Sequence, residues 1–172
     1  MKTVTLADLQ ESVQDKTAFT TLGDYLKIGS TYLTFAARTH PTRIVSPSHP
    51  NYIFYQYGKE YGHKITRPLN SNLFIESPAA LREMFERFML FLVDLRKHQN
   101  GIASQESKRS YIDSQEINQI VYTVQQTIGS IADSFDNPNQ SRKRAGQLFE
   151  TLVKLIIQEV GVECEPRTIN IP

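Results

Sequence analysis

One stretch near the end of the sequence, residues 141–160, constrains the fold of this chain more than any other. It reads SRKRAGQLFETLVKLIIQEV. Its apolar residues recur at intervals of three and four, which is the spacing of one helix face, and further apolar positions widen that face. These apolar residues are Leu148, Phe149, Leu152, Val153, Leu155, Ile156 and Ile157. The spacing predicts a long helix with most of its surface covered.

Three consecutive cations, Arg142, Lys143 and Arg144, stand at the start of this expected helix. A run of like charges usually forms a solvated face. Cations at a helix N-terminus also oppose the macrodipole, by a few tenths of a kcal/mol each, and a bound anion would relieve that cost. The free N–H groups of the helix end and the three cations would together form a phosphate-binding site. A solvated face and a phosphate site both remain open on this evidence.

One acid, Glu150, lies between Phe149 and Leu152, close to the edge of the apolar face. A carboxylate at such an edge can be held near a core and still point into a cleft. The sequence contains no glycine-rich phosphate loop, nucleophile elbow or zinc-finger spacing. Enzymatic chemistry would therefore depend on Glu150, and a single acid cannot carry out a hydrolysis.

The pattern S-R-K-R-A-G-x-x-F-E, followed by an apolar helix and a charged turn, resembles type II restriction endonucleases of the PD-(D/E)xK class. The resemblance is greatest to those that cut CCGG-type and CCWGG-type sites. In that family a helix with a similar start precedes the catalytic sheet, and its glutamate lines the metal-dependent active site. The resemblance implies that Glu150 is a catalytic residue and a Mg²⁺ ligand. It also implies that Arg142, Lys143 and Arg144 contact double-stranded DNA.

The family's defining aspartate and its (D/E)xK motif follow this helix on a hairpin, whereas this sequence ends at Pro172. Glu163 and Glu165 are each followed two positions later by a residue other than lysine. We therefore expect an N-terminal part that lacks the complete active site and is inactive alone. The expected division is a mostly helical N-terminal domain over residues 1–138 and the start of a nuclease-like core over 139–172, with helix 141–160 and an extended segment.

Three more helices and a hairpin are expected before residue 139. The first is a short helix that Thr5 can cap, with Asp8 three residues on. Ser77 and Pro78 are favourable as an N-cap and first helical residue, and the apolar run that follows predicts a helix buried on most sides. Asp113 and Glu116 have the spacing of a capping box before a second amphipathic helix that ends near Ser134. An aromatic run, a Gly58-Lys59-Glu60 turn and a basic run predict a hairpin over residues 51–67.

Other parts of the pattern leave alternatives open. Residues 19–37 are apolar and aromatic, and Gly23 and Gly29 interrupt them, which suggests a short helix followed by a second helix or a strand. The tyrosines and basic residues of the hairpin, Arg67 among them, could contact nucleic acid, or the tyrosines could face a core while the lysines face water. The predicted fold class is mainly α with a small β-hairpin (α+β), leading into the first helix and strand of a restriction-endonuclease-like α/β core.

Composition narrows the class of protein. The chain has 172 residues, 40% of them hydrophobic, and a formal net charge of +1, which is typical of a globular chain and not of a disordered or membrane protein. A near-neutral balance means that any DNA binding would depend on local patches. The single cysteine, Cys164, excludes an internal disulfide and a cysteine-based zinc site. We expect a cytoplasmic protein without a membrane span.

The expected function is that of a type II restriction endonuclease, which hydrolyses phosphodiester bonds of double-stranded DNA with Mg²⁺. A homodimer is the expected assembly. One alternative is a non-catalytic DNA-binding module, although residues 136–140 are too broken by proline for the usual helix-turn-helix. The other is a helical oligomerisation scaffold that uses the apolar faces of residues 77–95 and 117–131.

Overall fold

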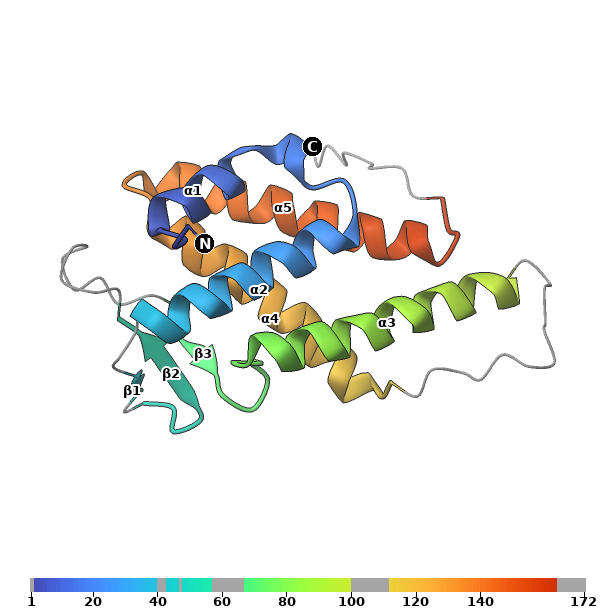
Figure 1. The fold of residues 1–172 in the computed structure, drawn as a ribbon, viewed down its shortest axis with the longest axis horizontal. Coiled ribbons are helices and arrows are strands. Elements are labelled where there is room, and N and C mark those ends of the chain that lie inside the picture. Colours follow the sequence, from blue (N-terminus) through green and yellow to red (C-terminus); the bar gives the residue numbers. More distant parts are fainter. Residues whose placement is uncertain (1, 40–42, 47, 57–66, 100–111, 164–172) are drawn as a thin grey trace, which may run out of the picture.

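The protein is mainly helical and carries a small antiparallel sheet (Figure 1). The computed structural model describes residues 2–39, 43–46, 48–56, 67–99 and 112–163. The helices are α1 (Leu6–Gln14), the short 3-10 helix η1 (Lys16–Ala18), α2 (Leu22–Thr39), α3 (Pro78–Gln99), α4 (Ser114–Asp133) and α5 (Pro138–Glu159). The strands are β1 (Arg43–Val45), β2 (Tyr52–Tyr55) and β3 (Leu69–Asn70). The expected α+β class, mainly α with a small β part, is confirmed.

Two helix starts lie where the sequence predicts them. Helix α4 begins with a complete capping box, in which Asp113 accepts the N–H of Glu116 at 2.8 Å and Glu116 accepts the N–H of Asp113 at 3.2 Å. Helix α3 begins at Pro78, and the Ser77 hydroxyl accepts the N–H of Ala80 at 3.2 Å. Each interaction satisfies an N–H group that the first helical turn would otherwise leave free.

The start of α5 differs from the prediction, because the helix begins at Pro138 and not near Ser141. Asn137 is the N-cap, and its side-chain oxygen accepts the N–H groups of Asn139 at 3.0 Å and Gln140 at 3.2 Å. Proline at the first helical position loses no hydrogen bond, and its fixed φ suits a helix. The Asn-Pro pair therefore starts this helix.

Residues 19–37, expected to form two elements, mostly belong to the single helix α2. Gly29 is buried, and a Cβ atom there would lie only 3.0 Å from Cδ2 of Leu81 on α3. The glycine therefore allows α2 and α3 to approach closely, and it does not interrupt the helix.

The helices share one core, in which α2 packs on α3 and α4, and α4 also packs on α1 and α5. In Figure 1, α3 lies alongside α2, and α4 passes behind them toward α5. Large side chains that are almost completely buried fill the centre, among them Tyr25, Tyr32, Leu81, Phe85, Phe88 and Ile120. The centre of the molecule is therefore aromatic and aliphatic, and α2 contributes Tyr25 and Tyr32 to it.

The sheet has the order β1-β2-β3 and lies at one end of α2 (Figure 1). Ile53 of β2 pairs with Val45 on one side and with Leu69 on the other. Strand β2 lies inside the expected hairpin, but the expected turn and most of its second arm fall outside the described residues. Arg67, the last residue of the expected hairpin, is described, whereas both lysines expected to face water, Lys59 and Lys64, lie outside the described residues.

Arg67 lies across α4. Its Nε is 2.9 Å from Oδ2 of Asp133, and its Nη1 is 3.4 Å from the side-chain oxygen of Gln126. A Cβ atom on Gly129 would lie 1.9 Å from Nη1 of Arg67, so the guanidinium occupies the space above this glycine. This ion pair connects the segment just before β3 to α4.

Two helices are less covered than the sequence predicts. On α5 only Ser141, Leu148 and Leu152 are buried, and Val153 is 38% exposed. On α3 one face is buried, but Leu90 is 61% exposed and Val93 40% exposed. The predictions of helices buried on most sides are therefore wrong for both, because α3 and α5 lie at the outside of the bundle. Among the described residues, no helix is both long and apolar enough to cross a membrane.

Candidate functional site

The candidate site is a row of residues on α5 that faces solvent. Arg142, Gly146, Glu150 and Lys154 follow one another at four-residue intervals, so they lie along one side of the helix. All four are exposed. A Cβ atom on Gly146 would meet no other atom of the described structure within 4 Å. The row is therefore open to an incoming group along its length.

The cations of this site do not stand at the end of the helix. Arg142 is the fifth residue of α5, counted from Pro138, so the cations begin in the second turn. Asn137 already occupies the N–H groups of Asn139 and Gln140. The expected phosphate site, which combined free N–H groups with the three cations, is therefore wrong in this form. Any anion binding here would depend on side chains.

The three consecutive cations point in different directions. Arg142 and Lys143 are exposed, and neither forms an ion pair or hydrogen bond within the described part of the chain. Arg144 is half-buried, and its Nη1 is buried without a hydrogen bond to any described residue. The hydroxyl and N–H of Thr17 lower the pKa of Asp15, and the charge of Arg144 lowers it further. Arg144 therefore faces the end of α1, and only Arg142 and Lys143 are open to a partner.

Glu150 is exposed and has no ion pair or hydrogen bond among residues 2–163 that the structure describes. The same part of the chain contains no group of three or more His, Cys, Asp or Glu side chains arranged to hold a metal ion. Magnesium usually binds through one or two carboxylates together with waters and substrate phosphates. Glu150 can supply one of those carboxylates, so the described residues do not complete a magnesium site.

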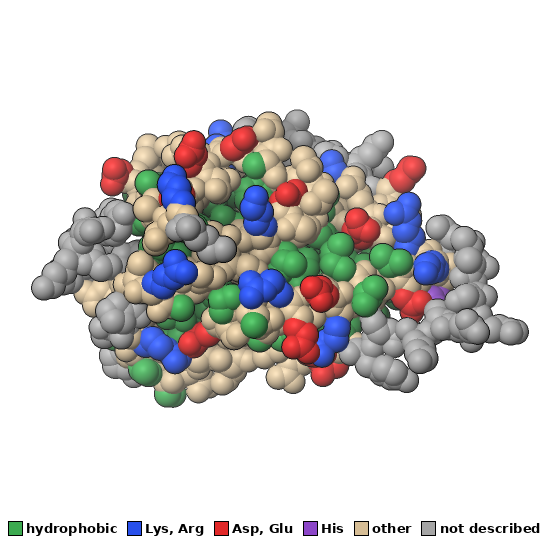
Figure 2. Space-filling view, viewed as in Figure 1, with side chains coloured by type: hydrophobic (Ala, Val, Ile, Leu, Met, Phe, Trp, Pro, Cys, Tyr) green, Lys and Arg blue, Asp and Glu red, His purple; other side chains and the backbone are tan. Residues whose placement is uncertain are grey.

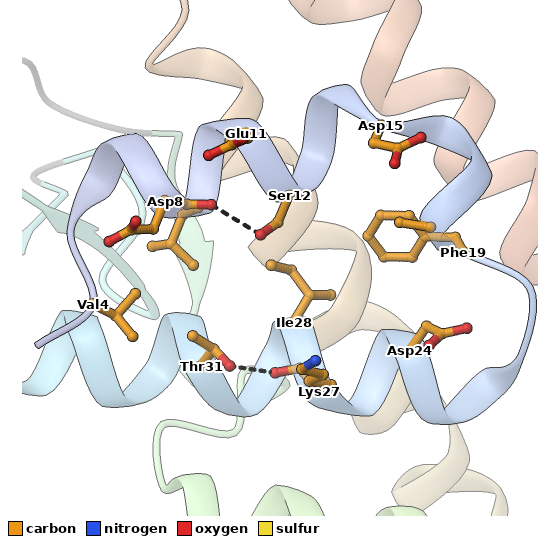
Figure 3. Close-up of a pocket in the computed structure, with 12 residues that line it drawn as sticks. Val4, Asp8, Glu11, Ser12, Asp15, Phe19, Asp24, Lys27, Ile28 and Thr31 are labelled. Carbon is orange, nitrogen blue, oxygen red and sulfur yellow. Dashed lines mark hydrogen bonds between the residues drawn. The ribbon is translucent and has the colours of Figure 1, made fainter. Parts of the chain in front are cut away.

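A cleft lies between α1, η1 and α2, and the sequence pattern does not predict it (Figure 3). This acidic cleft has a volume of about 470 Å³. Phe19 and Ile28 project between the two helices and form an apolar floor (Figure 3). The charged residues that line it are Asp8, Glu11, Asp15, Asp24 and Lys27. Four acids against one cation make this cleft unfavourable for nucleic acid.

Three acids of the cleft are already engaged in holding helix ends. The N–H of Thr5 lowers the pKa of Asp8, and the hydroxyl of Thr17 lowers that of Asp15. Burial raises the pKa of Asp24, but the N–H groups of Thr21 and Thr20 outweigh burial and leave it lowered. Thr5-x-x-Asp8 and Thr21-x-x-Asp24 are visible in the sequence as capping patterns. The cleft itself forms only when α1 and α2 pack together.

No protein-family model, no curated protein and no solved structure matches this chain.

Proposed function

We propose that this chain forms the N-terminal part of a Mg²⁺-dependent type II restriction endonuclease that cleaves double-stranded DNA in the cytoplasm and acts as a homodimer. The observation that carries the proposal is the exposed row on α5, in which an unpaired acid lies between exposed cations. The resemblance of residues 141–150 to the restriction endonuclease helix assigns the same residues to DNA and metal.

Spacing along the helix suits a DNA backbone. Arg142 and Glu150 are eight residues apart, which is about 12 Å along the axis at a rise of about 1.5 Å per residue. Phosphates of one DNA strand are spaced about 3.4 Å apart along the duplex axis. A phosphate bound by Arg142 or Lys143 would therefore lie a few nucleotides from the phosphate nearest Glu150. The cations would position the DNA strand, and Glu150 would lie near a different phosphate of the same strand.

Gly146 supports this arrangement, because it leaves free space between the cations and the acid. A larger residue there would project into the gap that a backbone phosphate has to enter. Glu150 would contribute one carboxylate to a metal site whose other ligands lie outside the described residues. Residues 1–172 alone are therefore expected to bind DNA weakly and not to cleave it.

The test is the Glu150→Ala variant of the complete protein, assayed for cleavage of duplex DNA with Mg²⁺. We expect cleavage to be lost while DNA affinity stays within about twofold, because removing one carboxylate leaves the phosphate contacts in place. Folding should be unaffected, because Glu150 is exposed and alanine favours a helix. The matched control is Glu159→Ala, which removes the same charge from the opposite side of α5.

Cleavage by Glu150→Ala at the wild-type rate would contradict the role of this residue. A complete protein that binds duplex DNA but never cleaves it with Mg²⁺ would overturn the nuclease proposal and favour a non-catalytic DNA-binding module. A complete protein that binds no DNA at all would overturn both.

A further inference from the structure

The outward face of α3 is the most exposed apolar surface among the described helices. Leu90 and Val93, with 61% and 40% of their surface exposed, lie on the side opposite the buried residues Phe88 and Leu92. An apolar groove of about 380 Å³ runs beside them, and Gly23 and Leu26 of α2 form its other wall. Figure 2 shows apolar side chains gathered over this region, with charged side chains around them. A surface of this kind usually marks an interaction site.

The charges next to this apolar pair are arranged asymmetrically along the helix. Glu86 lies four residues before Leu90, and Lys97 lies four residues after Val93. At about 100° per residue, all four side chains fall within roughly 60° of one another around the helix. Glu86 and Lys97 are both exposed, and neither forms an ion pair within the described structure. Along this face of α3 an acid is therefore followed by two apolar residues and then by a base.

This order is complementary to itself when two copies run antiparallel. A two-fold axis between Leu90 and Val93 places each Leu90 opposite the partner's Val93. The same register places each Glu86 opposite the partner's Lys97. The intervals of four, three and four residues are also those of the seam between two packed helices. A parallel pair would instead place Glu86 against the partner's Glu86 and Lys97 against the partner's Lys97.

We propose that the chain forms a two-fold symmetric dimer through α3, with the α3 helices of the two copies antiparallel. The apolar contact is made by Leu90 and Val93 of each copy over the groove that Leu26 borders. Each interface contains two ion pairs, from Glu86 to the partner's Lys97 and the reverse. An isologous contact of this kind closes on itself and leaves no unpaired surface for further growth.

The occupant of this surface is a second copy, because the charge order matches itself. Burial of the apolar pair and the groove drives association. The ion pairs set direction and register, since exposed ion pairs contribute little net affinity while like charges in contact oppose a wrong arrangement. The proposed nuclease is a homodimer, and the α3 contact names the surface through which that dimer would form. The residues of this contact are separate from the row on α5, so loss of the dimer and loss of cleavage can be observed separately.

The experiment measures the mass of the full chain against concentration by sedimentation equilibrium. Wild type is expected to dimerise. Glu86→Lys and Lys97→Glu should each weaken the dimer by about tenfold or more, because each changes two symmetry-related attractions into repulsions. The double variant, Glu86→Lys with Lys97→Glu, should dimerise again, and an equal mixture of the two single variants should form heterodimers.

The control is Glu11→Lys, which makes the same charge change on exposed α1 and should leave the dimer unchanged. Circular dichroism of every variant establishes that α3 remains folded. A wild type that stays monomeric at all concentrations would overturn the proposal. So would single variants that dimerise like wild type, or a double variant that stays monomeric. A mixture of the two single variants that dimerises more tightly than wild type would be the signature of parallel helices and would also overturn it.

Discussion

The hydroxyl of Tyr25 connects α2 to the helix that carries the candidate site. Tyr25 is completely buried, and its hydroxyl donates a hydrogen bond of 2.5 Å to the backbone carbonyl of Leu148 on α5. Tyr25→Phe removes this bond and keeps the ring, which packs against Phe19 at a centroid distance of 4.8 Å. We expect the free energy of unfolding at neutral pH to fall by about 1 kcal/mol, the usual net value of one hydrogen bond.

The same hydroxyl makes stability depend on alkaline pH. Burial raises the pKa of Tyr25 well above its usual value near 10, and only a smaller effect of Thr151 opposes that rise. Above pH 10 the unfolded chain therefore loses this proton while the folded chain keeps it. Stability from this group is complete below pH 10 and is lost as pH rises beyond it. The loss reaches about 1.4 kcal/mol at pH 11.

The Tyr25→Phe variant has no such proton to lose, so the two proteins should respond differently to alkali. The difference of about 1 kcal/mol seen at pH 8 should shrink above pH 10, vanish between about pH 10.5 and 11, and be slightly reversed at pH 11. Urea unfolding followed by circular dichroism at several pH values measures it. Tyr55→Phe is a second case, because burial raises the pKa of Tyr55 as well, followed by the charge of Glu76. A difference that stayed constant from pH 8 to pH 11 would refute the reasoning.

Two further predictions concern the DNA surface and a helix cap. Replacing Arg142 and Lys143 together by alanine should reduce the slope of log affinity against log salt by about two, since each phosphate contact contributes about 0.9. Arg144→Ala should hardly change that slope, because this side chain is half-buried and faces Asp15. Fluorescence anisotropy with duplex DNA at several salt concentrations measures the slope for each variant. Equal effects of the two replacements would contradict the assignment of Arg142 and Lys143 as the phosphate contacts. Asp113→Ala should lower the free energy of unfolding by about 1 kcal/mol through loss of the capping box. Gln115→Ala, at an exposed neighbouring position, should have no such effect in urea unfolding.

Local signals explain what could be predicted of the fold. The starts of α3 and α4 follow from Ser77-Pro78 and from Asp113 with Glu116, because a cap is made within four residues and needs no tertiary contact. The start of α5 was missed although Asn137-Pro138 is also a favourable start. Asparagine and proline occur in turns as well as at helix starts, and the apolar pattern that separates the two cases begins only later.

Features that depend on packing were not visible in the sequence. Gly29 looked like an interruption, whereas its role is the close approach of Leu81 from another helix. Arg142 and Arg144 are alike in type and two positions apart, yet one faces solvent and the other the end of α1. Only the orientation of α5 on its neighbours decides which side of the helix is open. Glu150 lies at the edge of the apolar stripe, where the sequence suggests a carboxylate held near a core, whereas the structure leaves it exposed.

The net charge is close to zero, but the acidic and the basic side chains have different environments. Asp8, Asp15 and Asp24 accept hydrogen bonds from threonines at helix ends, which stabilises local structure in the N-terminal region. Arg142 and Lys143, by contrast, have no counter-ion among the described residues. Acids that are engaged in helix ends add little to a distant surface, because salt screens charges within about 10 Å at 0.1 M ionic strength. A local positive surface on α5 is therefore compatible with a net charge of +1, and its strength should be judged from these two side chains.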